Sequence, residues 1–486
     1  MIFSSIPFLY YFLPFVLILY FFVRTRYKNG ILFLTSLVFY AWGEPIYVLL
    51  MLLTILIGYG SGYWIDRYRR EGKEKYKKQS LYGGLFFCIG TLVFFKYMGF
   101  LVDNFTSVFG GLAGTNGSHL GVFVKIRNIA LPIGISFYTF QVISYLLDVY
   151  WDTVPVQKNI ISFGTYVTMF PQLIAGPIVR YKDISHQLID RNLTLHETAV
   201  GIRRFIFGFA KKILIANQLG ELCSIFWSSN EKSIVFYWMY ALAVTLQIYF
   251  DFSGYSDMAI GLGKILGFDF PENFNYPFIS GSITEFWRRW HMTLGTWFRD
   301  YVYIPLGGNR VKKSRWYINI LIVWMLTGIW HGASWNFVLW GLYFAGILLI
   351  EKQWLLKFLE KGRVWNRIYV LFLVMVSFLL FDAADLTTAK ETIGCLFGLK
   401  GGSVLPFITT ETLYYLKSYA VIYVMAVIGA TPLIKNIIVN LNKHKQQTIV
   451  SWFIVVAEPV VLIILLFIGT AYLVDGSFNP FLYFRF

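Results

Sequence analysis

The sequence has few charged residues and no long hydrophilic segment. Asp, Glu, Lys and Arg make up 14% of its 486 residues and 57% are hydrophobic, whereas soluble domains carry roughly 25% charged residues. Apolar runs extend from Ile6 to Leu473 with no hydrophilic domain between them. A soluble chain this apolar would have more core than its polar residues could cover. We therefore predict a single membrane-embedded domain over residues 1–486.

Cysteine is also scarce, and several catalytic motifs are missing. Cys88, Cys223 and Cys395 stand alone in or beside apolar stretches, without the spacing of a metal site or a disulfide framework. No Ser or Cys stands in a nucleophile-elbow motif and HExxH does not occur, so serine hydrolysis and metal-dependent hydrolysis have no support. We expect no metal ion. We also expect no nucleic-acid partner, because the net charge of +16 lies in short loops between apolar runs.

The apolar runs have the lengths of membrane spans. A spanning helix needs about 20 apolar residues, and the shorter runs predict tilted, broken or hairpin segments. We therefore predict an all-α polytopic fold with about eleven spans and one or two re-entrant or interfacial pieces. The runs near full length are Ile6–Val23, Pro45–Ile65, Leu81–Leu101, Ile129–Tyr150, Val364–Phe381, Tyr419–Ile434 and Ile449–Val474, and the shorter ones are Ile31–Trp42, Tyr317–Trp330 and Ser334–Ile350.

The basic residues predict which side of the membrane each loop occupies. Arg24, Arg26 and Lys28 follow the first apolar run, which lacks the basic start and the small-residue cleavage site of a signal peptide. By the positive-inside rule these charges are cytoplasmic, which places both ends of the chain outside. The other basic clusters agree with this orientation: Arg67–Arg70, Lys73–Lys78, Arg310–Arg315, Lys352–Arg367, Lys435 and Lys443–Lys445.

The segment Phe163–Arg180 breaks the pattern of span and loop. It contains MFPQLIAGP, with two prolines and a glycine within seven residues, which a regular helix cannot accommodate. Backbone freed from hydrogen bonding at membrane depth must be buried in protein or line a wet cavity. We predict a re-entrant element here, with an interfacial loop as the alternative.

Two acidic residues, Asp251 and Asp257, lie in the span-like run Gln247–Gly267. Inserting such a charge into a membrane costs roughly 2.5–3.5 kcal/mol, so an ionisable residue at this depth is a functional candidate. Both are candidates for binding substrate or donor. Alternatively, each pairs with an arginine and holds two helices together.

The segment Gly281–Asp300 reads as one interfacial helix rich in aromatics and arginine. Ser282 can cap its start, with Glu285 at capping-box spacing. The positive charges of Arg288, Arg289 and Arg299 suit an anionic cofactor such as a nucleotide-bearing thioester, and they suit lipid phosphates equally well. The predicted apolar face consists of Phe286, Trp290, Leu294 and Trp297.

Two of the six histidines, His291 and His331, are candidates for catalysis because each follows a tryptophan in apolar surroundings. His331 lies between two shorter runs, where Gly328 and Gly332 permit a bend and a close backbone approach. A polar side chain at such a break should face a cavity, and a neutral imidazole there can take a proton from an alcohol as it attacks an acyl carbon. The alternative is a hydrogen-bonded packing residue. The other four histidines have polar or loop-like contexts: His119, His186, His196 and His444.

Seven segments, in one order, resemble a known family. The pattern is similar to that of the membrane-bound O-acyltransferases, in particular the bacterial branch that O-acetylates alginate and other exported glycans. The segments cover nearly the whole chain, and the motif-rich catalytic core lies at about residues 131–350. They are MIFSSIPFLYYFLPF, SFYTFQVISYLLDVY, MFPQLIAGPIVRY, YFDFSGYSDMAIGLG, FWRRWHMTLGTWFRDYVYIPLGG, TGIWHGASWNFVLWG and NPFLYFRF.

This resemblance implies a fold, a reaction and residue roles. Members of the family form a helical disc with funnels from both faces that meet near an embedded histidine. By motif match, His331 corresponds to the histidine with the central catalytic role, and His291 to a second one that positions the donor or completes the site. The implied reaction needs no metal and no permanently bound cofactor. Trp335 and Asn336, just beyond His331, are candidates to orient its ring or to donate to a developing oxyanion.

The resemblance also implies partners and a location. The donor is acetyl-CoA or an acyl-carrier thioester on the cytoplasmic side of the bacterial cell membrane, whose lipid surrounds the protein. The acetyl group reaches an extracytoplasmic glycan directly or through a separate hydrolase-like partner, since the sequence carries no such domain. Three alternatives stay open: D-alanyl transfer to teichoic acid through a carrier protein, a glycan exporter, and a scaffold for a secretion complex.

The chain departs from the family pattern at one position. Within Leu379–Ala383, many relatives carry an arginine where this sequence has Asp382. We therefore do not carry over any contact that the arginine makes at the outer face, whether with a partner or with a glycan.

Overall fold

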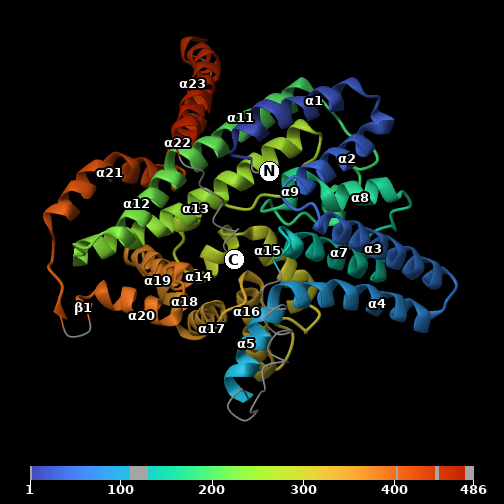
Figure 1. Ribbon diagram of the computed structural model, residues 1–486, viewed down its shortest axis with the longest axis horizontal. Coiled ribbons are helices and arrows are strands. Elements are labelled where there is room, and N and C mark those ends of the chain that lie inside the picture. Colours follow the sequence, from blue (N-terminus) through green and yellow to red (C-terminus); the bar gives the residue numbers. More distant parts are fainter. Residues whose placement is uncertain (1–2, 110–129, 401–402, 444–447, 477–486) are drawn as a thin grey trace.

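The computed structural model describes residues 3–109, 130–400, 403–443 and 448–476 (Figure 1). The closing NPFLYFRF motif, His119 and His444 lie outside the described residues. The predicted all-α fold is confirmed. Within the described residues, strand pairing is limited to one antiparallel contact between the two-residue strands β1 (Leu399–Lys400) and β2 (Ser403–Val404).

Seven helical segments of the described chain are long and apolar enough to cross a membrane. The count of about eleven spans stays a prediction, because shorter apolar helices such as that over Pro7–Phe22 also occur. The protein is a multi-pass membrane protein. The seven segments are Tyr47–Arg70, Glu74–Val108, Ile234–Ile265, Trp335–Leu359, Trp365–Asp382, Thr410–Gly429 and Val456–Asp475.

The N-terminal part forms one side of the molecule, where the long helices α3 and α4 pack side by side (Figure 1). A π-helical turn, η3, joins α4 to α5 without a break in the helix. The elements of this part are η1 (Pro7–Phe12), α1 (Leu13–Phe22), η2 (Thr25–Tyr27), α2 (Lys28–Ala41), α3 (Tyr47–Arg70), α4 (Glu74–Leu92), η3 (Val93–Tyr97), α5 (Met98–Phe109), α7 (Ile135–Tyr150), α8 (Ile160–Thr168), α9 (Phe170–Leu173) and α10 (Tyr181–Ile184).

The helix α13 (Ile234–Ile265) runs through the centre, capped at its start by Ser233, whose Oγ accepts from the Phe236 N–H at 3.2 Å (Figure 1). Glycines allow α11 to pack closely on it, since a Cβ at Gly201 would lie 2.6 Å from the carbonyl oxygen of Gly261. The neighbouring elements are α11 (Leu195–Ala210), η4 (Lys211–Ala216) and α12 (Asn217–Ser228).

The predicted hairpin around His331 is present. Helix α16 (Lys313–His331) ends at the histidine, Gly332 is extended, and α17 (Trp335–Ile350) returns against it. A Cβ on Gly328 would collide with the carbonyl oxygen of Phe337 on α17, so the close approach of the two helices requires glycine. The remaining C-terminal elements are η7 (Glu351–Leu355), α18 (Leu356–Leu359), α19 (Trp365–Asp382), α20 (Leu386–Cys395), α21 (Thr410–Gly429), α22 (Leu433–Lys443) and α23 (Thr448–Asp475).

The single helix predicted over Gly281–Asp300 is wrong. Ser282 caps α14 (Ile283–Arg289) as predicted, but the chain then breaks at His291, whose φ is +42°, before α15 (Met292–Phe298) and η6 (Arg299–Tyr303). An irregular loop containing η5 (Pro277–Ile279) precedes this segment, and its Asn273 carbonyl accepts the Met292 N–H at 3.0 Å. The predicted apolar face is therefore divided, and its members are buried in the protein instead of facing the membrane interface: Phe286, Trp290, Leu294 and Trp297.

The segment with MFPQLIAGP breaks as predicted. Helix α8 stops at Thr168, the short α9 follows, and residues 174–180 are irregular before α10. Every residue from Ser162 to Val179 is buried, so the freed backbone lies within the protein. The predicted burial is confirmed, and the segment is not an exposed interfacial loop.

Candidate functional site

His331 lies at the end of α16, inside an aromatic enclosure. Its side chain is buried, with 6% of the residue exposed. The imidazole meets the rings of Trp330, Trp340 and Phe381 at centroid distances of 5.0, 5.1 and 5.2 Å, all nearly edge-on. Such a dry, apolar shell excludes water from whatever the ring contacts.

His291 lies in the break between α14 and α15 and faces the same enclosure. Only 2% of it is exposed, and its ring lies 4.7 Å from the ring of Phe252 and 6.0 Å from that of Trp330. Trp330 therefore contacts both candidate histidines. The structure brings together two residues that are separated by 40 positions in the sequence.

The tautomer of His291 follows from a directed chain of hydrogen bonds. The backbone N–H of Ile178 donates to Thr293 Oγ1 at 3.0 Å, so the Thr293 hydroxyl hydrogen is available for Asn273 Oδ1, at 2.9 Å. Asn273 Oδ1 is an acceptor, and His291 Nδ1, at 3.0 Å, must donate to it. His291 Nε2 then carries a lone pair, and it has no hydrogen-bond partner among the described residues. Asn273 thus orients the imidazole so that its other nitrogen can act as a base, an arrangement that is typical of catalytic histidines.

Asn273 was not predicted from the sequence. It lies in the irregular loop after α13 and is 1% exposed, with its Nδ2 donating to Ser256 Oγ on α13 at 3.0 Å. The residue thus joins three elements: α13, the loop and the start of α15. A polar residue between Pro271 and Pro277 carries no periodic signal, so only the tertiary contact identifies it.

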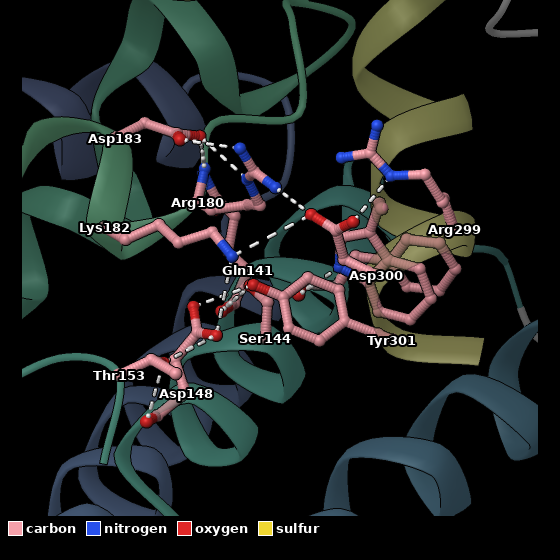
Figure 2. A network of polar contacts seen from close by, with 12 residues as sticks. Gln141, Ser144, Asp148, Thr153, Arg180, Lys182, Asp183, Arg299, Asp300 and Tyr301 are labelled. Atoms are coloured by element: carbon pink, nitrogen blue, oxygen red, sulfur yellow. Dashed lines mark hydrogen bonds and ion pairs between the residues drawn. The ribbon is translucent and has the colours of Figure 1, made fainter. Parts of the chain in front are cut away.

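A network of ion pairs and hydrogen bonds between side chains anchors the Ile178 segment to the helices around it (Figure 2). Arg180 donates to Asp183 at 2.8 Å and to Asp300 at 2.7 Å, which ties the loop after α9 to η6. Tyr301 OH donates to Asp148 Oδ2 on α7 at 2.7 Å. In Figure 2, Lys182 reaches between Asp148 and Asp300. The network holds Ile178 where its N–H meets Thr293.

Asp300 is ionised in this network at neutral pH. Partial burial alone would raise its pKa, but the hydrogen bond from Arg299 and the charges of Arg299, Arg180 and Lys182 outweigh burial and hold the pKa below its usual value. The ionised carboxylate is the form that bridges the two arginines.

Asp251 and Asp257 are both ion-paired. Buried Lys212 pairs with Asp251, while Asp257 accepts from Arg204 at 2.9 Å and from Lys211 at 2.6 Å. These ion pairs join α11 and η4 to α13, as expected from the alternative in which each aspartate holds two helices together. That alternative named arginines as the partners, whereas two of the three partners are lysines. Binding of donor by either aspartate stays a prediction.

A cavity of about 460 Å³ is lined by residues next to His291 in the sequence and in its hydrogen-bond network. Its wall contains Asn273 and Met292, the residue that follows His291. Cationic groups from three elements also line it: Arg204, Lys211 and Lys435. Lys435, predicted to be cytoplasmic, lies on α22 and lines the same cavity as Asn273.

The two arginines of α14 lie elsewhere. Arg288 is exposed, and Arg289 pairs with Glu285 at 2.8 Å. Neither is among the residues that line the cavity in the described part of the chain. Their role in donor binding stays a prediction without geometric support from this cavity.

Trp335 and Asn336 direct their donors at neighbouring segments. Trp335 is 55% exposed and donates from Nε1 to Asn104 Oδ1 at 3.0 Å. Asn336 is buried and donates to the carbonyl oxygen of Ala383 at 2.8 Å, which fixes α17 to the end of α19. Beside it, Asp382 accepts from Tyr240 OH at 3.0 Å, so the residue that departs from the family pattern joins α19 to α13.

Comparison with known proteins identifies the family. The model of the membrane-bound O-acyltransferase family matches residues 153–381. A probable alginate O-acetylase AlgI of Azotobacter vinelandii is 41% identical over 404 residues, which cover 82% of this chain and 78% of the relative. The chain belongs to the membrane-bound O-acyltransferase family. This O-acyltransferase is also 30% identical to a peptidoglycan O-acetyltransferase of Helicobacter pylori, over 100% of this chain and 98% of that protein.

A more distant relative of the O-acyltransferase is a teichoic acid D-alanyltransferase of Bacillus subtilis. It is 30% identical over 260 residues, which cover 50% of this chain and 62% of that protein. The region matched by the family model contains both candidate histidines, Asp251, Asp257 and Asn273. The family resemblance seen in the motifs is thereby confirmed.

Proposed function

We propose that this O-acyltransferase takes an acetyl group from acetyl-CoA on the cytoplasmic side of the bacterial cell membrane and delivers it to a hydroxyl on the outer side, for O-acetylation of an exported glycan. The printed names of two relatives support an acetyl group and a glycan, since one is an alginate O-acetylase and the other a peptidoglycan O-acetyltransferase. The observation that carries the proposal is the placement of His331 and His291 against the same ring, Trp330.

The position of His331 fits a hydroxyl that arrives from outside. Helix α16 starts at Lys313, in a basic cluster predicted to be cytoplasmic, and ends at the histidine. At 1.5 Å per residue, this helix of 19 residues is about 28 Å long, close to the thickness of the apolar layer. His331 is therefore at the end of its helix that is far from the basic cluster, which supports an approach of the hydroxyl from the opposite side.

In the proposed reaction, His331 acts as general base on the acceptor hydroxyl. Its imidazole takes the hydroxyl proton while the oxygen attacks the thioester carbonyl, and the new ester C–O bond forms as the C–S bond breaks. The thiolate of CoA leaves and is protonated from the imidazolium, which restores neutral His331. The aromatic shell of Trp330, Trp340 and Phe381 keeps water from competing as acceptor.

We propose that the cavity beside Asn273 holds the donor. Lys435 at its rim and Lys211 and Arg204 in its wall supply positive charge for the phosphates of CoA. Asp257 and Glu272 neutralise part of this charge, because Arg204 contacts both and Lys211 contacts Asp257. The thioester end of the donor would then point past Asn273 toward His291.

His291 completes the donor side of the site. With Nδ1–H committed to Asn273, the Nε2 lone pair can accept a proton or position a group that carries one. An extracytoplasmic hydrolase-like partner receives the acetyl group on the outer side and places it on the glycan. The membrane lipid around the apolar helices completes the set of partners.

The experiment compares donors with purified full-length protein in lipid nanodiscs. Incubation with radiolabelled acetyl-CoA should release free CoA and yield a labelled acceptor when a glycan hydroxyl or the partner is supplied. D-alanyl transfer from a carrier protein is the second candidate, supported by the similarity to the teichoic acid D-alanyltransferase. Turnover of a D-alanyl carrier thioester with none of acetyl-CoA would reject the acetyl proposal, and a glycan exporter would turn over neither.

A further inference from the structure

A buried lysine meets the backbone of the candidate catalytic histidine. Lys96 lies in the π-helical turn η3 and is 8% exposed. Its Nζ donates to the carbonyl oxygen of Trp330 at 2.6 Å and to that of His331 at 3.1 Å, with Ser136 Oγ at 3.4 Å. The lysine comes from a helix that is 234 residues away in the sequence from the tryptophan it contacts.

The next residue, Tyr97, extends the same contact. Its hydroxyl donates to the carbonyl oxygen of Ile329 at 2.8 Å. Three successive carbonyls at the end of α16, those of residues 329–331, thus receive donors from two successive residues of η3. The last carbonyls of a helix have no partner within the helix, and a cation near them interacts favourably with the negative end of the helix dipole.

The π-helical turn makes this double contact possible. Such turns widen a helix locally and occur often at functional sites. Here the turn presents Lys96 and Tyr97 together to α16 without ending the span formed by α4 and α5. The ammonium also lies 5.8 Å from the ring of Trp330, the ring that both histidines contact.

The other buried lysines have different surroundings. Lys212 pairs with the carboxylate of Asp251, and the ammonium of Lys28 lies over the ring of Tyr20 at 4.7 Å. Within the described residues, Lys96 instead has neutral carbonyl and hydroxyl oxygens as its hydrogen-bond partners. A cation buried this deeply is costly, and its contacts concentrate on the last two residues of α16.

We propose that Lys96, assisted by Tyr97, is a positioning residue that fixes the end of α16 and thereby holds the His331 imidazole where it can act on the acceptor. The proposal rests on the proposed role of His331. Gly332 follows His331 directly, and a glycine does little to restrain the backbone. The contacts of Lys96 and Tyr97 with the last carbonyls of α16 therefore fix this end of the helix. A displacement of about 1 Å at a reacting group can cost on the order of 100-fold in rate.

The test measures kcat and KM for acetyl-CoA turnover by full-length variants in nanodiscs. Lys96→Met keeps the length of the side chain and removes all donors, and we expect kcat to fall by about 10-fold to 100-fold with little change in KM. Tyr97→Phe removes one donor and should give a smaller fall in the same direction. Lys28→Met is the matched control, because it removes another buried lysine at a distance from α16 and should leave kcat unchanged.

Lys96→Gln keeps one donor and serves if the methionine variant does not accumulate as folded protein. We expect it to reduce kcat by several-fold, again at constant KM. The proposal is overturned if both Lys96 variants have the wild-type kcat per folded molecule. The same holds if only one of them folds and that one has the wild-type kcat, because the lysine would then serve stability alone.

The failure of this proposal is distinguishable from that of the proposed function. If His331→Ala keeps full activity, the role of His331 is rejected, whereas an inactive His331→Ala beside a fully active Lys96→Met rejects only the role of Lys96. If acetyl-CoA is not turned over by the wild type, the donor is rejected. In that case the variants are compared in cells, by the base-labile O-acetyl content of the exported glycan. We expect the variants to rank in this assay as they are expected to rank in kcat.

Discussion

His291 Nδ1 lies 3.0 Å from Asn273 Oδ1, and the hydrogen bond between them has one direction. An amide oxygen can only accept, and the backbone N–H of Thr293 at 3.4 Å and its hydroxyl at 2.9 Å both donate to Asn273 Oδ1, so the imidazole nitrogen is the donor. The Thr293 hydroxyl in turn accepts from the backbone N–H of Ile178 at 3.0 Å, which ties the MFPQLIAGPI segment to the group that orients His291. Two motifs that are far apart in the sequence act on the same side chain.

The first prediction concerns Thr293. Thr293→Val keeps the shape of the side chain but removes the hydroxyl that donates to Asn273 Oδ1, so the amide that orients the His291 ring is held less firmly. We expect the kcat of acetyl transfer to fall by roughly 10-fold, and Asn273→Ala to lower it further, since general acid–base groups contribute about 10²–10⁴-fold. Steady-state kinetics on folded protein checks both variants.

Thr296→Val is the control for this prediction. Thr296 lies one turn further along α15 and is half-buried. Its loss should leave kcat unchanged. If the two threonine substitutions have equal effects, the packing of threonine in α15 matters, and the hydrogen bonds of Thr293 with Ile178 and Asn273 do not.

A second prediction separates the structural and functional interpretations of Asp251. The buried pair with Lys212 leaves an uncompensated charge when only one partner is replaced, which costs about 3–5 kcal/mol. We expect Asp251→Asn to reduce the amount of folded protein strongly. The double variant Asp251→Asn with Lys212→Met should recover both folding and acetyl transfer, measured by fluorescence-detected size exclusion and by CoA release. A folded but inactive double variant would assign the pair of Asp251 and Lys212 to the reaction.

The proposed donor cavity makes a third prediction. Lys435→Glu reverses a charge at its rim, so we expect the KM for acetyl-CoA to rise several-fold with kcat nearly unchanged, and the effect to weaken as ionic strength increases. Lys75→Glu is the control, because it reverses an exposed charge that is also predicted to be cytoplasmic. It should change neither KM nor kcat. An unchanged KM in Lys435→Glu would remove the cation at the rim from the proposed donor site.

The fourth prediction concerns pH and the ion network around Asp300. Its pKa is lowered in the folded state, so the stabilisation is present above the unfolded-state pKa of about 3.9 and is lost as the pH falls through the folded-state pKa. Asp300→Asn should lower Tm by about 1–3 °C at neutral pH. The difference from wild type should stay constant down to about pH 5 and shrink below about pH 4, measured by differential scanning fluorimetry. A difference that grows on acidification would contradict this assignment.

Local patterns predicted much of the fold and part of the site. The proline- and glycine-rich segment, the hairpin at His331 and the Ser282 cap all follow from residues that act within a few positions of each other. The break at His291 was missed because Phe286, Trp290, Leu294 and Trp297 fit one continuous helix. Two backbone hydrogen bonds to the loop of Asn273 and Asn275 open that helix, and no local pattern reports them.

Asn273 and Lys96 were missed for different reasons. Asn273 acts across 18 positions from an irregular loop, so its role depends on tertiary structure alone. Lys96 did carry a signal, because it is an ionisable residue within an apolar run, as Asp251 is. The aromatic enclosure of His331 required the fold, since Phe381 and Trp340 come from two further helices.

The central claim is that His331 is the base for acyl transfer, and His331→Gln in nanodiscs tests it most directly. Glutamine is similar in size and polar, but it cannot take the hydroxyl proton. We predict that the rate of acetyl transfer from labelled acetyl-CoA falls by about 10²–10⁴-fold while the elution profile and Tm stay those of folded protein. Transfer at the wild-type rate by folded His331→Gln would contradict the account.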